Sequence, residues 1–213
     1  MNKRSVLIVG RMFFGLLTLT ALGYQLVYLA QLGVFNPANF FAYFTNLSNI
    51  FAAVVLLIGA VYLLQHRDPT PPEDMVRGAS VAAILLVFIV YGILLRDIDL
   101  GNLQPWVNSV IHYIFPLAVL ADWLILPPKS TLRVQQLGYW LIYPLAYLVY
   151  TLIRGAIVGF YPYPFLNPNP DPVHHTAGSY GAVALYCVAI FVAFLVVSWL
   201  LVLVGNRLQR NLA

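Results

Sequence analysis

The chain has 213 residues, of which 62% are apolar and only 8% are charged. A soluble domain carries about 25% charged residues, so this composition excludes an ordinary soluble fold and requires lipid as the solvent for much of the surface. In a soluble protein the formal charge of +4 would suggest nucleic-acid binding. Here it is better explained by Lys and Arg retained in cytoplasmic loops, and no nucleic-acid partner is expected. The single cysteine, Cys187, excludes a disulfide within the chain.

The N-terminal segment has the charge pattern of a secretory signal but not its length. Lys3 and Arg4 precede an apolar run that extends from Ser5 to about Ala30. This run is longer than a signal h-region, and no small-residue cleavage site follows it. We therefore expect a retained first membrane span that also directs insertion.

Six apolar segments are long enough to cross a bilayer, which takes roughly 20 helical residues. Proline-containing loops separate them, and only Pro116 and Pro144 fall inside a span. The predicted fold is an all-α membrane protein, a single domain over residues 1–213 with six transmembrane helices. The spans are predicted near residues 6–30, 41–64, 77–95, 106–126, 138–160 and 179–205.

The basic residues predict the orientation of these spans. Arg96 is the one basic residue expected in the opposite loops, and the other side carries Lys3, Arg4, Arg11, Arg67, Arg77, Lys129, Arg133, Arg207 and Arg210. By the positive-inside rule, both termini are expected in the cytoplasm. A multi-pass protein of the bacterial inner membrane is the predicted location. Arg11 and Arg77 lie at the cytoplasmic edges of their spans, where their long side chains are expected to snorkel.

Polar residues at membrane depth indicate where the function lies, because removing them from water is expensive. In the second span Thr45, Ser48 and Asn49 are spaced i, i+3, i+4, and Asn46 lies beside them. In the fourth span Asn108 and His112 are spaced i, i+4. At 1.5 Å per residue, Thr45 lies roughly 6 Å and His112 about 9 Å from the outer ends of their spans. This shared level predicts one outward-leaning cavity.

The fifth span adds a polar stripe that reaches a similar depth. It consists of Tyr143, Tyr147, Tyr150 and Arg154 at i, i+4, i+7 and i+11. Arg154 lies about 9 Å from the outer end of its span. It could bind a substrate carboxylate bidentately or satisfy backbone carbonyls near the proline-rich loop.

Each of these residues has both a structural and a catalytic interpretation. Thr45 could bond its own i−4 carbonyl, or its hydroxyl could be a nucleophile with His112 as general base. Asn46 and Asn49 could join helices or stabilise an oxyanion. Asp122 lies about 15 Å from His112 along the helix, too far to orient the imidazole, which favours a buried structural hydrogen bond or a snorkelled position at the end of the span. His174 and His175 lack a second ligand cluster, so a solvated loop is expected there instead of a metal site.

Taken together, the polar motifs resemble those of a known family. They comprise the segment from Phe41 to Asn49, the pair Asn108 and His112 followed by Asp122, Arg154-Gly155, and the segment from Gly159 to Leu166. Over essentially its whole length the chain resembles a bacterial-type member of the six-span family of androgen-induced protein and androgen-dependent TFPI-regulating protein. Animal members of that family are threonine hydrolases that cleave fatty acid esters of hydroxy fatty acids.

The resemblance implies a carboxylic ester hydrolase with Thr45 as nucleophile and His112 as base, acting on a lipid ester without a metal or cofactor. The expected oxyanion or substrate contacts are Asn46, Asn49, Asn108, Tyr150 and Arg154. The alternative is a non-enzymatic transporter or receptor for a small amphiphile that uses the same polar cavity.

Overall fold

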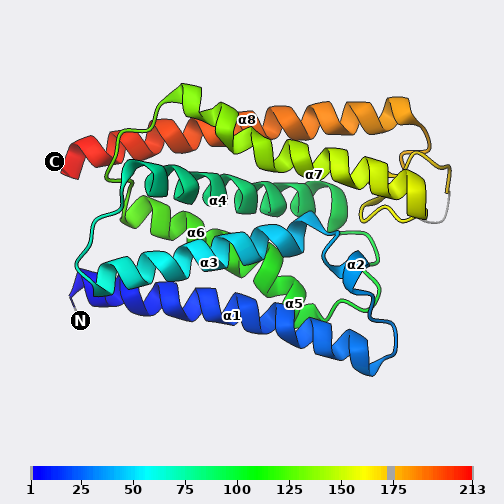
Figure 1. Cartoon of the computed structure of the whole chain (residues 1–213), viewed down its shortest axis with the longest axis horizontal. Coiled ribbons are helices and arrows are strands. Elements are labelled where there is room, and N and C mark those ends of the chain that lie inside the picture. Colours follow the sequence, from blue (N-terminus) through cyan, green and yellow to red (C-terminus); the bar gives the residue numbers. More distant parts are fainter. Residues whose placement is uncertain (1, 172–175, 213) are drawn as a thin grey trace.

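The computed structural model describes residues 2–171 and 176–212, and this part of the chain is helical without a strand. The long helices are α1 (Lys3–Gln31), α3 (Phe44–Leu64), α4 (Pro71–Val90), α6 (Phe115–Ile125), α7 (Leu137–Val158) and α8 (Tyr180–Leu212) (Figure 1). The short elements are α2 (Pro37–Phe40), α5 (Pro105–Ser109), the π-helical turns η1 (Tyr91–Leu95) and η2 (Val110–Ile114), and the 3₁₀ turns η3 (Val134–Gln136) and η4 (Pro164–Leu166). The solvated loop predicted at His174 and His175 falls outside the described residues.

The six predicted spans are confirmed, because six helical segments are long and apolar enough to cross a membrane. The third begins at Pro71, six residues before the predicted start at 77. Pro71 and Pro72 form its first turn, where a missing N–H removes no helical bond. Thr70 and Glu73 complete a capping box at this end. The last helix continues to Leu212, beyond the predicted end at 205.

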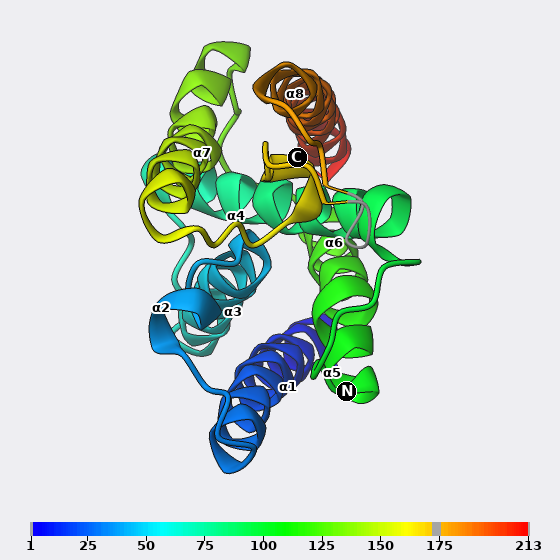
Figure 2. The ribbon, with the colours of Figure 1, turned by 90° about the vertical axis from the view of Figure 1, so that its right-hand side faces the viewer.

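The helices form a bundle around α4, which packs against α3, α6, α7 and α8, whereas α1 packs on α3 and α6 (Figure 2). The outer faces are apolar: Ile157 of α7 is 77% exposed and Leu185 of α8 is 73% exposed. Apolar side chains this exposed on long helices belong in lipid, so the chain is a multi-pass integral membrane protein. Both termini lie at one end of the bundle, the terminal end; the opposite end is called the chamber end (Figure 1).

Arg11 does not snorkel, contrary to the sequence prediction. Its side chain is buried in the bundle, where Nε donates to Asp122 Oδ1 at 2.6 Å and Nη2 donates to Asp122 Oδ2 at 3.0 Å. Gly59 makes room for this guanidinium, since a Cβ there would lie 2.6 Å from Arg11 Nη1. The ion pair therefore joins α1 to α6, and Asp122 has the structural bonding expected of it.

Small residues set the spacing between other helices. Gly78 of α4 contacts the ring of Trp140 of α7, and a Cβ at position 78 would overlap that buried indole. This contact holds the start of α7 against the central helix. Gly23 of α1, in contrast, has nothing within 4 Å of the place where its Cβ would be.

Gly78→Ala is expected to lower the free energy of unfolding by about 1–3 kcal/mol, because the added methyl group forces Trp140 out of its site. Gly23→Ala is the matched control and is expected to be neutral or slightly stabilising, because alanine favours helix. Thermal unfolding of the purified protein in detergent measures both. Equal melting temperatures for the two variants would contradict this account of the α4–α7 contact.

Candidate active site

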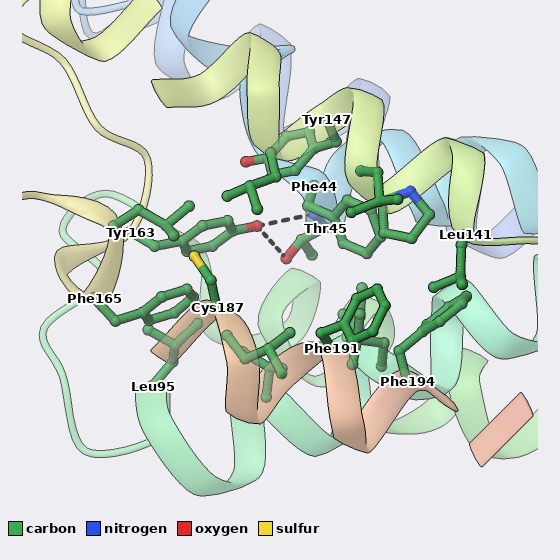
Figure 3. Close-up of a pocket in the computed structure, with 18 residues that line it drawn as sticks. Phe44, Thr45, Leu95, Leu141, Tyr147, Tyr163, Phe165, Cys187, Phe191 and Phe194 are labelled. Carbon is green, nitrogen blue, oxygen red and sulfur yellow. Dashed lines mark hydrogen bonds between the residues drawn. The ribbon is translucent and has the colours of Figure 1, made fainter. Parts of the chain in front are cut away.

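The N-terminus of α3 places Thr45 in the wall of the bundle at the chamber end. Thr45 is the second residue of α3, so its backbone N–H has no acceptor within the helix. The phenol oxygen of Tyr163 accepts this N–H at 3.0 Å and lies 3.0 Å from Thr45 Oγ1 (Figure 3). The helix-capping residue Tyr43 makes no side-chain cap bond, so a tyrosine distant in sequence caps α3 and binds the candidate nucleophile.

The chain after α7 folds back to bring Tyr163 to this position. Gly159 ends α7 in the left-handed conformation, with φ of 72°, which glycine adopts without strain. The ring of Tyr161 then packs directly on Gly155, where no side chain stands in its way. Burial raises the pKa of the Tyr163 phenol above its ordinary value. The phenol therefore stays protonated and can donate to Thr45 Oγ1.

His112 lies in one π-helical turn and stacks on a tyrosine from another. The ring of His112 (η2) is 3.8 Å from that of Tyr91 (η1), with 16° between their planes. Nδ1 of His112 lies 2.6 Å from Oδ1 of Asn108, and Nδ2 of Asn108 donates to the Tyr91 hydroxyl at 2.7 Å. Because an amide oxygen only accepts, the imidazole proton lies on Nδ1. The other ring nitrogen, Nε2, is then free to accept a proton.

The π-helical turn at His112 has a cause in the sequence. Pro116 lacks the N–H that would bond to the His112 carbonyl, and its ring crowds that carbonyl. Instead of the normal helical bond to Ile111, the N–H of Phe115 bonds to the carbonyl of Val110. This leaves the carbonyl of Ile111 without its helical partner. Turns of this type occur frequently at functional sites.

Asn49 satisfies the carbonyl that this turn releases. Its Nδ2 donates to Ile111 O at 3.2 Å and to Thr45 O, in its own helix, at 2.9 Å. Its Oδ1 is buried and has no partner within the described residues. The bond to Ile111 holds α3 against the helix of His112, so the amide nitrogen of Asn49 is engaged in positioning these two helices.

A cavity of about 880 Å³ occupies the chamber end, and we call it the polar chamber. Thr45, Asn46, Tyr91, His112 and Tyr163 all contribute to its wall. The structure thus brings the two predicted catalytic residues to one cavity, as their depth along the spans predicts. No hydrogen bond joins them within the described residues, and the hydroxyl of Thr45 is bonded to Tyr163.

A second cavity, of about 100 Å³, meets the first at Thr45 and Tyr163, which line both; we call it the apolar groove. Its other lining residues are almost all apolar, and they include Leu145 and Leu148 of α7 and Phe191 of α8 (Figure 3). Leu145 is also 43% exposed on the lipid-facing side. Thr45 therefore lies at the boundary between a space suited to an acyl chain and a space suited to water.

Two predicted asparagine contacts have other roles in the structure. Asn46 lines the polar chamber, with Nδ2 bonded to the carbonyl of Phe40 at 2.8 Å. Asn108 orients His112 and Tyr91, so its amide is already engaged on both sides. The backbone N–H of Asn46 lies in the first turn of α3, where N–H groups have no acceptor within the helix. This N–H and those of the same helix end form a positive dipole end beside the chamber.

Arg154 and Tyr150 do not line the polar chamber. Arg154 donates from Nη2 to Asn39 Oδ1 at 2.6 Å, and this bond connects α7 to α2. The guanidinium of Arg154 also lies over the ring of Phe160. Tyr150 is 47% exposed on the outer face of α7. The predicted stripe therefore divides, because only Tyr143 and Tyr147 turn toward α3, where they bond Ser48 and the carbonyl of Ala42.

The mouth of the polar chamber is acidic. Asp97, Asp99 and Asp171 contribute to its wall, and no Lys or Arg of the described chain does so. Arg96 pairs with Asp97 at 3.1 Å just outside, and such an exposed pair is weak. No group of three or more His, Cys, Asp or Glu that could hold a metal ion occurs among the residues the structure describes.

The sequence interpretation missed Tyr91 and Tyr163. Tyr91 meets His112 only through the packing of one span on the next, and Tyr163 reaches Thr45 only because the chain reverses after α7. The proline at 116, four residues after His112, was a usable signal for the π-helical turn.

Comparisons with known proteins give no relative: no family model, no curated protein and no solved structure matches the chain.

Proposed function

We propose that the protein is an integral-membrane threonine hydrolase that cleaves lipid esters, with Thr45 as nucleophile and His112 as general base. The observation that carries the proposal is the position of Thr45, between an apolar groove and a polar chamber that contains His112. An ester hydrolase for lipids needs these two environments at its nucleophile: one holds the acyl chain, and the other holds water and the departing alcohol.

In the first step the hydroxyl oxygen of Thr45 attacks the ester carbonyl carbon. His112 Nε2 takes the hydroxyl proton, directly or through one water of the chamber. Tyr163 donates to Thr45 Oγ1 and so leaves the threonine hydrogen free to point toward His112. The ester C–O bond then breaks, and His112 returns the proton to the departing alkoxide. The product of this step is an alcohol and an acyl ester on Thr45.

In the second step water attacks this acyl ester and transfers its proton to His112. The acyl–threonine bond breaks, the fatty acid leaves, and Thr45 regains its proton from His112. Asn108 holds the imidazole through Nδ1, which is the role of the third member in a catalytic triad. The backbone N–H of Asn46 and the dipole of α3 stabilise the oxyanion that forms in both steps.

The resemblance noted above suggests fatty acid esters of hydroxy fatty acids as substrates, and these carry a free carboxylate. The acidic mouth of the chamber favours esters without such a charge, since like charges repel. We therefore propose neutral lipid esters as the preferred substrates. The protein would lie in the bacterial inner membrane with its terminal end toward the cytoplasm, as the basic residues of that end favour.

A fluorophosphonate probe is expected to label the wild-type protein at Thr45, because such probes react with activated hydroxyl nucleophiles. Thr45→Ala is expected to lose both the labelling and the cleavage of a fluorogenic lipid ester, whereas Thr45→Ser keeps part of each. Ser109→Ala, which removes an exposed hydroxyl near His112, is the control and is expected to behave like wild type. Undiminished labelling of Thr45→Ala, located by peptide mass spectrometry, would refute Thr45 as the nucleophile.

Removal of the base tests a separate part of the mechanism. His112→Ala is expected to lower kcat by about 10²–10⁴-fold, the usual contribution of general acid–base catalysis. Asn108→Ala leaves the imidazole in place but unoriented, so kcat is expected to fall about tenfold or more while KM changes little. Wild-type turnover by His112→Ala would refute His112 as the base. If the wild-type protein binds an amphiphilic ester and leaves it intact, the transporter or receptor alternative becomes the better account.

The acidic mouth predicts a charge preference among substrates. The methyl ester of a fatty acid ester of a hydroxy fatty acid is expected to be cleaved a few-fold faster, in kcat/KM, than the same molecule with its free carboxylate. Salt screens exposed charges, so the difference is expected to narrow as ionic strength rises. A preference for the free acid would show that a cation outside the described wall binds the carboxylate.

A further inference from the structure

A second buried polar cluster lies at the terminal end of the bundle, far from the polar chamber. The carboxylate of Asp122 accepts from two arginines, Arg11 of α1 at 2.6 Å and Arg77 of α4 at 2.8 Å. Arg77 Nη2 also donates to the carbonyls of Asp122 and Leu126, and its guanidinium lies over the ring of Trp123. A buried guanidinium group, that of Arg11, and a partly buried one, that of Arg77, thus share one carboxylate.

In this arrangement Arg77 has no hydrogen-bonded carboxylate to itself, because it shares Asp122 with Arg11. All the hydrogen bonds that Arg77 makes within the described chain run through Nη2, so its Nε and Nη1 have none. An unpaired charge inside a protein is costly unless an anion compensates it. Asp74 interacts electrostatically with Arg77, but its carboxylate accepts from the backbone N–H of Ser130 and does not line the cavity described next.

The arginines border a cavity of about 320 Å³ between α3, α4 and the loop after α6. Its other charged residues already form pairs, Arg67 with Glu73 at 2.7 Å and Lys129 with Asp68 at 3.4 Å. These pairs cancel, so the excess charge of the cavity is that of Arg11 and Arg77 with Asp122.

The same cavity has an apolar side. Val55, Ile58 and Val76 line it, and Ile58 and Val76 are 43% and 42% exposed on the lipid-facing surface. Arg11 lies about 12 Å and Arg77 about 9 Å along their helices from the terminal end. The charged wall is therefore at a depth that a lipid headgroup can reach, and the apolar wall continues into the region of the acyl chains.

We propose that this cavity binds the phosphate of an anionic phospholipid, from the leaflet at the terminal end, with Arg77 as its principal ligand. A phosphate accepts hydrogen bonds from the donors that Arg77 leaves unused within the described chain, and it suits the planar donor set of a guanidinium. Basic pockets between transmembrane helices bind lipid headgroups in this manner. The apolar side wall favours a lipid over a free phosphate ion. The proposal is independent of hydrolysis at Thr45.

Native mass spectrometry of the full chain, purified in a neutral detergent and stripped of lipid, tests the proposal. Phosphatidylglycerol and phosphatidylcholine with identical acyl chains are titrated against wild type, Arg77→Gln and Arg210→Gln. Arg210 is exposed at the same end and lies outside the cavity, so its variant matches the loss of charge. Wild type and Arg210→Gln are expected to bind phosphatidylglycerol at least tenfold more tightly than phosphatidylcholine, and Arg77→Gln is expected to lose this preference.

Two further measurements test the cavity itself and the kind of anion it binds. Arg77 also supports the fold, so Ile58→Trp fills the cavity from its lipid-facing side without a change of charge, and it too is expected to abolish the preference. Inorganic phosphate is titrated against the protein with phosphatidylglycerol bound. If it displaces the lipid at an equal concentration of phosphate groups, the cavity is a small-anion site and the lipid assignment is overturned. Equal behaviour of Ile58→Trp and wild type, or the absence of a headgroup preference in wild type, would overturn the site itself.

Discussion

The arrangement of the candidate active site depends on one hydrogen bond, from the amide of Asn49 to the carbonyl of Ile111. A bilayer offers no water to a released backbone carbonyl, so the protein must supply its partner. The π-helical turn before Pro116 releases that carbonyl, and α3 has to approach closely enough for Asn49 to reach it. The same asparagine bonds the carbonyl of Thr45, one turn earlier. The need to satisfy one backbone carbonyl therefore fixes α3, which carries Thr45, against the helix of His112.

Much of the fold could be predicted from the sequence because the bilayer imposes a simple rule on it. Spans of about 20 apolar residues follow from the thickness of the membrane, and the common depth of Thr45 and His112 follows from counting residues along helices. The partners of these residues could not be predicted in the same way. Tyr163 reaches Thr45 only because the chain reverses at Gly159, and Arg11 leaves the membrane edge only because Asp122 lies across from it. Both facts depend on tertiary packing, which hydropathy does not encode.

The two buried polar clusters differ in a way that separates structural from chemical roles. At the terminal end the charged side chains bond mainly to one another and join α1, α4 and α6. At the chamber end the polar side chains bond in a chain from Tyr91 through Asn108 to His112, whose second ring nitrogen remains unused beside a large cavity. Both clusters cost free energy to bury. In the first, hydrogen bonds and ion pairs within the protein offset much of that cost, whereas in the second the Nε2 atom of His112 makes no hydrogen bond within the described residues.

The hydrogen bond between Tyr163 and Thr45 links the position of the loop after α7 to the boundary between the apolar groove and the polar chamber. Tyr163 caps α3, lines the boundary between the groove and the chamber, and belongs to a segment held to α7 by the contact of Tyr161 with Gly155. If this segment moved away, α3 would lose its cap, and the wall that separates acyl chain from water would open at the nucleophile. In the proposed hydrolase, a lipid substrate that reaches Thr45 from the groove would therefore have to displace or accommodate the phenol, whereas water would enter from the chamber. Because Tyr163 lies at the boundary between the groove and the chamber, its position would decide whether substrate or water reaches Thr45 first in the proposed reaction.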